Sequence, residues 1–138
     1  MVDRPLEFLY AGLRVRDVDR SLRFYQGLGF RVHQRGTMEH GGVWIHLRLP
    51  GDRHRLELNY YPKGNRFYEP FRRGTEFDHL GFRVRDVAGW RRRLRSLKAP
   101  IVADFTEEGQ RLIYAEDPDG NWVEFFGPAS PAKRRHST

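Results

Sequence analysis

Two glutamates and one histidine have the residue types and the neighbours expected of a divalent metal site. Glu57 stands in the sequence LEL and Glu124 in VEF, so each carboxylate lies between apolar residues in a stretch typical of a β-strand. His79 opens the stretch HLGFRVRDV. One imidazole and two carboxylates suit Ni²⁺, Zn²⁺, Fe²⁺, Mn²⁺ or Co²⁺. A single glutamate of this kind is better explained as a solvated residue on an open sheet face, but two at matching places favour a metal site.

Strand alternation puts these side chains on one face of the predicted sheet structure. In a strand, residues i and i+2 point to the same side. Ala11, Leu13 and Val15 form an apolar row that is expected to lie under a helix, which turns Tyr10 to the opposite side. The same alternation assigns these residues to the face away from the helices: Tyr10, Arg14, His46, Glu57, His79, Arg83 and Glu124.

The sequence pattern of the elements that carry these residues occurs twice in the chain. LRVRDV, at 13–18, returns as FRVRDV, at 82–87, which is 69 residues later. Each copy precedes a helical pattern and then three strand-like stretches. The strands are expected at 30–35, 42–49 and 54–61, and again at 100–105, 110–117 and 121–127. A shared strand–helix–strand order of this length indicates two modules packed into one fold.

The predicted fold is α+β, with two tandem βαβββ modules forming a curved mixed sheet. The chain of 138 residues is expected to be a single domain. Module 1 covers about 8–61, a linker about 62–77, module 2 about 78–127, and a flexible basic tail 129–138. By the 69-residue offset, Tyr10 of module 1 stands where module 2 has His79.

Composition and charge exclude several functional classes. The chain has no cysteine, which rules out disulfides, thiolate catalysis and thiolate metal sites. The net charge of +7 comes largely from the stretch WRRRLRSLK and the tail AKRRHST, which are a solvated helix face and a chain end, so no nucleic-acid partner is expected. Neither a membrane span nor a signal-peptide pattern is found, and we expect a cytoplasmic protein.

The motifs together resemble the vicinal oxygen chelate superfamily, which includes glyoxalases, bleomycin resistance proteins and extradiol dioxygenases. The resemblance covers about 8–127 and rests on LRVRDVDRSLRFYQGLGF, RLELNYY, DHLGFRVRDV and DPDGNWVEFFG. It is closest to the glyoxalase I (lactoylglutathione lyase) branch. In that branch each module supplies one ligand from its first strand and one glutamate from its last. The resemblance therefore implies one divalent metal ion, of unknown identity, at Tyr10, Glu57, His79 and Glu124.

Tyr10 departs from the family pattern, in which histidine is usual and some relatives have glutamine. A neutral phenol is a weak metal ligand. Three interpretations remain open: Tyr10 coordinates as a phenolate, donates to a metal-bound water, or stacks on the substrate. His46 is an alternative metal ligand that could replace the histidine missing at position 10. A strand histidine of this kind is also commonly a structural residue.

The glyoxalase I resemblance implies a lyase or isomerase reaction. The substrate would be the hemithioacetal of a 2-oxoaldehyde with a thiol such as glutathione, or a related 2-oxo compound. The metal would stabilise an enediolate. Glu124 would move the proton between neighbouring carbons, with Glu57 holding the metal and sharing in proton transfer.

The resemblance also implies substrate contacts. Arg14 matches a position that contacts the carboxylate of glutathione, and a guanidinium suits that contact. Tyr61 stands where the family has asparagine, and with Tyr10 it departs from the pattern for glutathione. Trp44, on the same strand row as His46, completes the expected substrate-binding residues.

Two other functions remain open, and both follow from the same superfamily. A metal-free drug-binding or resistance protein would use the fold without metal ligation. An extradiol dioxygenase would need two histidines and one glutamate around Fe²⁺, which requires His46 to replace the missing first histidine. Short two-module relatives commonly form dimers, so we expect a homodimer acting on a small molecule.

Overall fold

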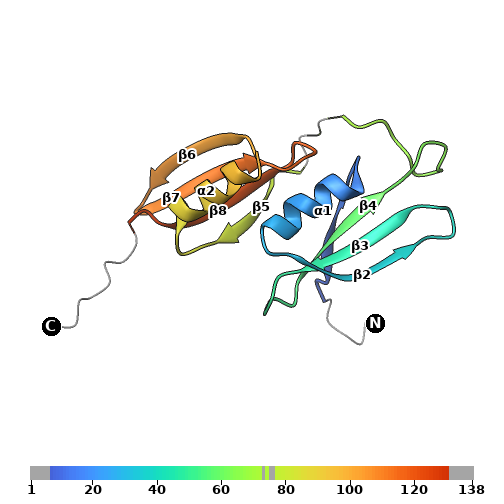
Figure 1. Ribbon diagram of the computed structural model, residues 1–138, viewed down its shortest axis with the longest axis horizontal. Coiled ribbons are helices and arrows are strands. Elements are labelled where there is room, and N and C mark those ends of the chain that lie inside the picture. The colour runs from blue at the N-terminus through green and yellow to red at the C-terminus, as the bar shows by residue number, and fades with distance from the viewer. Residues whose placement is uncertain (1–6, 73, 75–76, 131–138) are drawn as a thin grey trace, which may run out of the picture. The chain divides into compact units, whose positions relative to one another are not determined.

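The computed structural model describes residues 7–72, 74 and 77–130 (Figure 1). The chain divides into two compact units, 1–72 and 73–138, and each is described by itself. The expected basic tail lies outside the described residues from 131 onward. Within the described part, no helix is both long enough and apolar enough to cross a bilayer.

Module 1 is a four-stranded mixed sheet with one helix. Its elements are β1 (Tyr10–Arg14), α1 (Val18–Gly27), β2 (Arg31–Thr37), β3 (Val43–Arg48) and β4 (Arg55–Tyr60). The strands are ordered β1-β4-β3-β2. β1 runs parallel to β4, and the other pairs are antiparallel.

Module 2 repeats this arrangement. Its elements are β5 (His79–Arg83), α2 (Val87–Ser96), β6 (Ile101–Glu107), β7 (Gln110–Glu116) and β8 (Trp122–Pro128). The order is β5-β8-β7-β6, with β5 parallel to β8. The α+β class and the two βαβββ modules are therefore confirmed, and the mixed sheet is observed as one four-stranded sheet in each module.

The repeated RVRDV sequence sets the turn from strand to helix in both modules. Asp17 accepts a hydrogen bond from the Arg20 backbone N–H at 3.0 Å, and Asp86 accepts one from the Gly89 N–H at 3.0 Å. Each aspartate thus caps the amino end of the helix that follows it. α1 ends at Gly27, and Gly29 turns the chain with a φ of 113°, a backbone angle that favours glycine.

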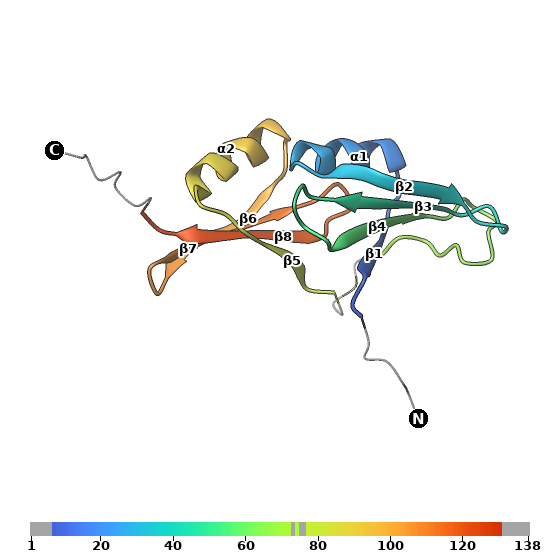
Figure 2. The ribbon, with the colours of Figure 1, turned by 90° about the horizontal axis from the view of Figure 1, so that it is seen from below.

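The core of each module lies between its sheet and its helix. Figure 2 shows α1 over the sheet of module 1 and α2 over that of module 2. Leu13 and Val15 are buried as the alternation predicts. The other fully buried side chains include Tyr25, Ile45, Leu47 and Leu58 in module 1 and Leu94, Ile113, Val123 and Phe125 in module 2. Burial of this apolar area is the main stabilising contribution.

The parallel strand pairs place a glycine beside each glutamate. Gly12 of β1 pairs with Glu57 of β4, and Gly81 of β5 pairs with Glu124 of β8. A Cβ atom at either glycine would lie 3.6 Å and 3.7 Å, respectively, from Oε1 of the glutamate. Each carboxylate therefore lies over the neighbouring strand, at ordinary van der Waals distance from these positions.

Candidate metal and substrate site

Glu124 is a buried acidic residue of module 2, with 9% of its surface exposed. Its Oε2 accepts a hydrogen bond from the Tyr114 hydroxyl, on the adjacent strand β7. The same oxygen lies 3.6 Å from Nε2 of His79. The predicted residues His79 and Glu124 therefore come together where the edge strand β5 lies beside β8.

The contact that Nδ1 of His79 makes determines which ring nitrogen is free to bind a metal ion. Nδ1 lies 2.5 Å from Oδ1 of Asp78. A carboxylate can only accept, so Nδ1 carries the proton, and in the neutral ring Nε2 presents its lone pair toward Glu124. An imidazole held through Nδ1 by an acidic residue is the usual arrangement of a metal-binding histidine.

Glu57 of module 1 has its own histidine partner, but from a different strand. Nε2 of His46 lies 2.6 Å from Oε2 of Glu57, and the two side chains are only 9% and 15% exposed. Asn59 donates from Nδ2 to the other oxygen, Oε1, at 2.8 Å. Both carboxylate oxygens of Glu57 are thus held within the module.

Two aromatic rings fix the His46 imidazole in place. Tyr10 lies 4.8 Å from it and Trp44 lies 4.9 Å from it, measured between ring centroids. Tyr10 is 41% exposed, whereas His46 is buried. The structure therefore brings together four of the predicted residues of module 1, and Tyr10 contacts His46 through its ring. The four are Tyr10, Trp44, His46 and Glu57.

The nitrogen-to-oxygen separations test whether the two pairs fit a metal ion. Imidazole and carboxylate ligands lie about 2.0–2.2 Å from Zn²⁺, so two ligands of a tetrahedral ion are about 3.4 Å apart. The 3.6 Å separation between His79 and Glu124 fits this value, with acceptor atoms facing each other. The 2.6 Å separation between His46 and Glu57 does not, because it is the length of a hydrogen bond. Among the described residues, no three His, Asp or Glu side chains form a cluster suited to an ion.

Arg14 and Tyr61, both predicted to contact substrate, lie together at the other end of β1 and β4. The Arg14 guanidinium is 4.6 Å from the centre of the Tyr61 ring, and Nη1 donates to the backbone oxygen of Phe67. The segment after β4 therefore folds back over β1. This contact holds the guanidinium beside an aromatic ring, a favourable arrangement for a cation.

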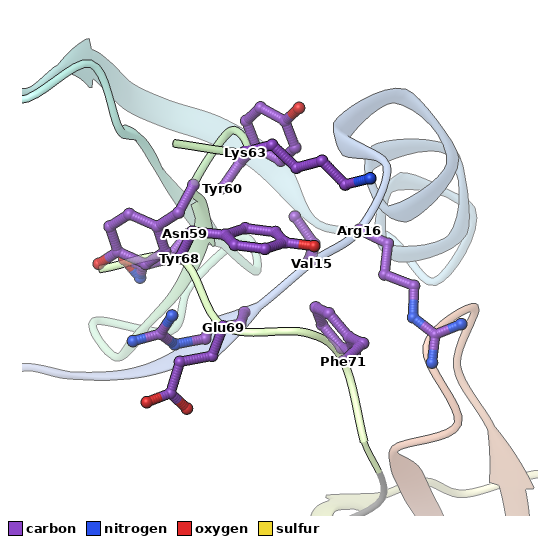
Figure 3. A pocket seen from close by; sticks show the side chains of 10 residues that line it. Val15, Arg16, Asn59, Tyr60, Lys63, Tyr68, Glu69 and Phe71 are labelled. Atoms are coloured by element: carbon purple, nitrogen blue, oxygen red, sulfur yellow. The ribbon is translucent and has the colours of Figure 1, made fainter. Parts of the chain in front are cut away.

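A pocket of about 500 Å³ opens beside Arg14, which is within the usual range for small-molecule sites (Figure 3). Aromatic and cationic side chains dominate its lining. Its residues are Arg14, Val15, Arg16, Asn59, Tyr60, Tyr61, Lys63, Tyr68, Glu69 and Phe71. Asn59 belongs both to this lining and to the hydrogen bonds of Glu57, so the pocket adjoins the Glu57 carboxylate.

Three polar residues of the site were missed by the sequence interpretation. Tyr114 lies opposite Glu124 as His46 lies opposite Glu57, so a strand-by-strand comparison of the modules would have found it. Asp78 precedes His79, and an acidic neighbour of a histidine was a visible signal. The hydrogen bond that Asn59 donates to Glu57 has no signal in the sequence.

The remaining histidines play other parts. His40 lies between Tyr61 and Phe67, with ring centroids at 5.9 Å and 4.8 Å. His54 is exposed and lies 3.0 Å from Oδ1 of Asp52. His33 is exposed as well. These residues lie away from Glu57 and do not enlarge its hydrogen-bond set.

Comparison with known proteins identifies the family of the chain. The sequence model of the Glyoxalase/Bleomycin resistance protein/Dioxygenase superfamily matches residues 7–125. The lactoylglutathione lyase of Haemophilus influenzae is 29% identical over 130 residues, which cover 88% of this chain and 92% of the relative. The uncharacterized protein YwbC of Bacillus subtilis is 24% identical over 121 residues, covering 85% of this chain and 94% of YwbC.

A solved structure extends the likeness to the fold. The trypanothione-dependent glyoxalase I of Leishmania major matches with a TM-score of 0.74 and 25% identity, over 89% of this chain and 87% of that one. The sequence match spans most of the chain and both modules. The chain belongs to the Glyoxalase/Bleomycin resistance protein/Dioxygenase superfamily.

Proposed function

We propose that the protein is a metal-dependent lyase or isomerase of the glyoxalase I type. Its substrate is the hemithioacetal of a 2-oxoaldehyde with a thiol, or a related 2-oxo compound. The observation that carries the proposal is the His79–Glu124 pair, in which an imidazole lone pair faces a carboxylate oxygen at 3.6 Å. The similarity to a lactoylglutathione lyase supports the same reaction class.

Glu57, His79 and Glu124 would hold the metal ion, with Tyr10 or His46 as the fourth candidate. A bound divalent ion would supply electrophilic polarisation of the two neighbouring substrate oxygens, which acidifies the C–H bond between them. Asp78 keeps the proton on Nδ1 of His79, so that Nε2 stays available as a ligand.

Glu124 would act as the base. Its Oε2 is held by the Tyr114 hydroxyl, whereas Oε1 lies over Gly81 on the neighbouring strand. Oε1 would take the proton from the carbon that carries the hydroxyl and the sulfur, and return it to the former carbonyl carbon. The reaction is an isomerisation, so no atom is gained or lost. Glu57 would share in the proton transfer.

The pocket beside Arg14 would bind the part of the substrate that does not react. Arg14, Arg16 and Lys63 favour an anionic group, and four aromatic rings favour a flat or apolar body. Trp44 and Tyr10 would flank the reacting end through their contacts with His46. We therefore propose a thiol component with at least one carboxylate, which includes glutathione.

Metal loading and activity test this function together. The purified chain is treated with chelator, reloaded with Ni²⁺, Zn²⁺, Mn²⁺, Fe²⁺ or Co²⁺, and assayed with methylglyoxal and several thiols. About one ion per chain and metal-dependent thioester formation are expected. Glu124→Gln should lower kcat by about 100-fold or more while keeping the fold. Absence of binding by any ion at micromolar concentration would overturn the proposal.

A small-molecule binding protein is the second candidate. Two features favour this alternative, because each can form without a metal ion. They are the 2.6 Å hydrogen bond between His46 and Glu57 and the aromatic pocket beside it. Tight binding of an aromatic anion by metal-free protein, with no turnover after reloading, would support it. The third possibility, an extradiol dioxygenase, would require iron-dependent ring cleavage of a catechol in the same assay series.

A homodimer in the cytoplasm completes the proposal. Large apolar side chains stand exposed on both modules, among them Phe67, Phe71, Phe105 and Trp122. Exposed apolar groups of this size are often covered by a second subunit. Light scattering coupled to size-exclusion chromatography measures the assembly, and cell fractionation measures the location.

A further inference from the structure

We infer that His46 and Tyr114 are matched positioning residues, each holding the glutamate of its own module through a donated hydrogen bond. Neither is a metal ligand, and of the two first-strand positions only His79 presents a free ring nitrogen to an ion. The inference rests on the proposed function only where it names Glu57 and Glu124 as metal ligands.

The strand register makes the two residues equivalent. His46 of β3 pairs directly with Glu57 of β4, and Tyr114 of β7 pairs directly with Glu124 of β8. In both modules the partner atom on the glutamate is Oε2. The same sheet position therefore carries an imidazole in one module and a phenol in the other, with the same contact.

The neighbours of His46 identify it as a donor. Nη1 of Arg55 lies 3.5 Å from Nδ1 of His46, and a guanidinium has no acceptor. Nδ1 therefore accepts, which leaves the ring proton on Nε2, and Nε2 donates it to Glu57. Both nitrogens of His46 are engaged, whereas His79 keeps an Nε2 lone pair free.

Tyrosine and histidine have thus exchanged places between the modules. Module 1 has tyrosine at the first-strand position and histidine as the donor, and module 2 has the reverse. The rings touch in both modules, at 4.8 Å between Tyr10 and His46 and at 5.2 Å between His79 and Tyr114. The absent histidine at position 10 is therefore not replaced by His46, and the protein side chains on the ion would be Glu57, His79 and Glu124.

Replacing His46 by tyrosine or by phenylalanine separates a donor from a ligand. Ni²⁺ binding to the full chain is measured by titration calorimetry. His46→Phe removes the donor and should weaken binding by about 10- to 100-fold, the usual effect of losing a group that orients a ligand. His46→Tyr keeps a donor, as Tyr114 does, and should bind within about threefold of the wild type. His54→Phe, an exposed histidine of the same module, is the matched control and should leave binding unchanged.

A larger ring at position 46 must fit between Tyr10 and Trp44, so a second variant guards against crowding. Tyr10→His combined with His46→Tyr reproduces the arrangement of module 2 and should bind Ni²⁺ at least as tightly as the wild type. The inference is overturned if His46→Tyr and its combination with Tyr10→His both lose as much Ni²⁺ affinity as His46→Phe. It is also overturned if His46→Phe loses no affinity.

Thermal unfolding in chelator separates this inference from the proposed function. Removing the donor leaves a part-buried Glu57 oxygen without its partner, so His46→Phe should melt at a lower temperature. The exchange variant Tyr10→His with His46→Tyr should recover the loss. This pattern in a chain that binds no Ni²⁺ would overturn the metalloenzyme and keep the donor assignment. If the chain binds Ni²⁺ but the melting temperatures do not follow this pattern, the metalloenzyme proposal stands and the donor assignment is overturned.

Discussion

The hydroxyl of Tyr114 donates to Oε2 of Glu124, across neighbouring strands at the centre of the second sheet. This hydrogen bond, followed by burial, raises the pKa of Tyr114 to about 12. The phenol therefore stays neutral throughout the physiological range and keeps its proton available to the carboxylate. Tyr114 thus orients Glu124 as a neutral hydrogen-bond donor.

The first prediction concerns the titration of this phenol. Absorbance of tyrosinate between pH 9 and pH 13 should show one late step in the wild type, absent in Tyr114→Phe. Glu124→Gln should move the step back toward about 10, the ordinary tyrosine pKa, because the carboxylate is the largest cause of the shift. A late step that survives Tyr114→Phe would assign it to another residue.

The same shift has a consequence for stability. A phenol whose pKa is raised in the folded protein stabilises the fold fully below the unfolded pKa of about 10, and this stabilisation is lost as the pH rises through about 12. Between these values the free energy of unfolding should fall more steeply for the wild type than for Tyr114→Phe. Urea unfolding at pH 9 and pH 11 measures the difference.

A second prediction concerns an ion-pair cluster that joins α2 to the sheet of module 2. Asp104 of β6 accepts from Arg111 at 2.8 Å and 3.0 Å and also from Arg91. The hydrogen bond from Arg111 is the main cause that lowers the pKa of Asp104. This stabilisation is therefore present above the unfolded pKa and is lost as the pH falls through the folded pKa.

Asp104→Asn should therefore lower the free energy of unfolding at pH 7 by about 1 kcal/mol, a value typical of a partly exposed charged network. The urea midpoints of wild type and variant should converge as the pH is lowered from 7 to well below the ordinary aspartate pKa of about 3.9. Arg111→Lys keeps the charge but loses the bidentate hydrogen bond to Asp104. Its free energy of unfolding at pH 7 should lie between those of the wild type and Asp104→Asn. A constant difference down to pH 2 would contradict the electrostatic explanation.

Much of the fold could be predicted because the chain repeats itself. The 69-residue offset and the strand alternation fix the order of elements and the face of each glutamate without any tertiary information. The pairing of His46 with Glu57 depends instead on strand register and side-chain rotamers, which a linear pattern does not encode. The pocket depends on the fold-back of the segment after β4, for which the sequence has no periodic signal.

A third prediction uses the tightest glycine in the second module. A Cβ atom at Gly127 of β8 would lie 2.1 Å from the backbone oxygen of Val84. Backbone atoms cannot move aside as a flexible side chain can, so Gly127→Ala should destabilise the protein by at least about 2 kcal/mol. Gly81→Ala, whose Cβ meets only an ordinary contact at 3.7 Å, is the control and should lose much less stability in urea unfolding.

The last prediction concerns substrate recognition by Arg14. Its guanidinium lies 4.6 Å from the Tyr61 ring at the pocket, a position suited to an anionic group that takes no part in the reaction. Under the proposed function, Arg14→Met should raise KM for the glutathione hemithioacetal about tenfold with little change in kcat, because the lost contact is the same in ground state and transition state. Arg14→Lys keeps the charge without the planar fork and should recover only part of the affinity.

Arg83 is the matched control for Arg14, since it occupies the equivalent position of module 2, 69 residues later. Its guanidinium lies 5.8 Å from the Phe126 ring, and Arg83 belongs to a different surface pocket. Arg83→Met should leave KM close to the wild-type value. An equal rise in KM for both variants would indicate that general positive charge, and not the pocket beside Tyr61, recruits the substrate. A rise confined to Arg14→Met, absent when the thiol lacks a carboxylate, would identify the carboxylate as the group that Arg14 binds.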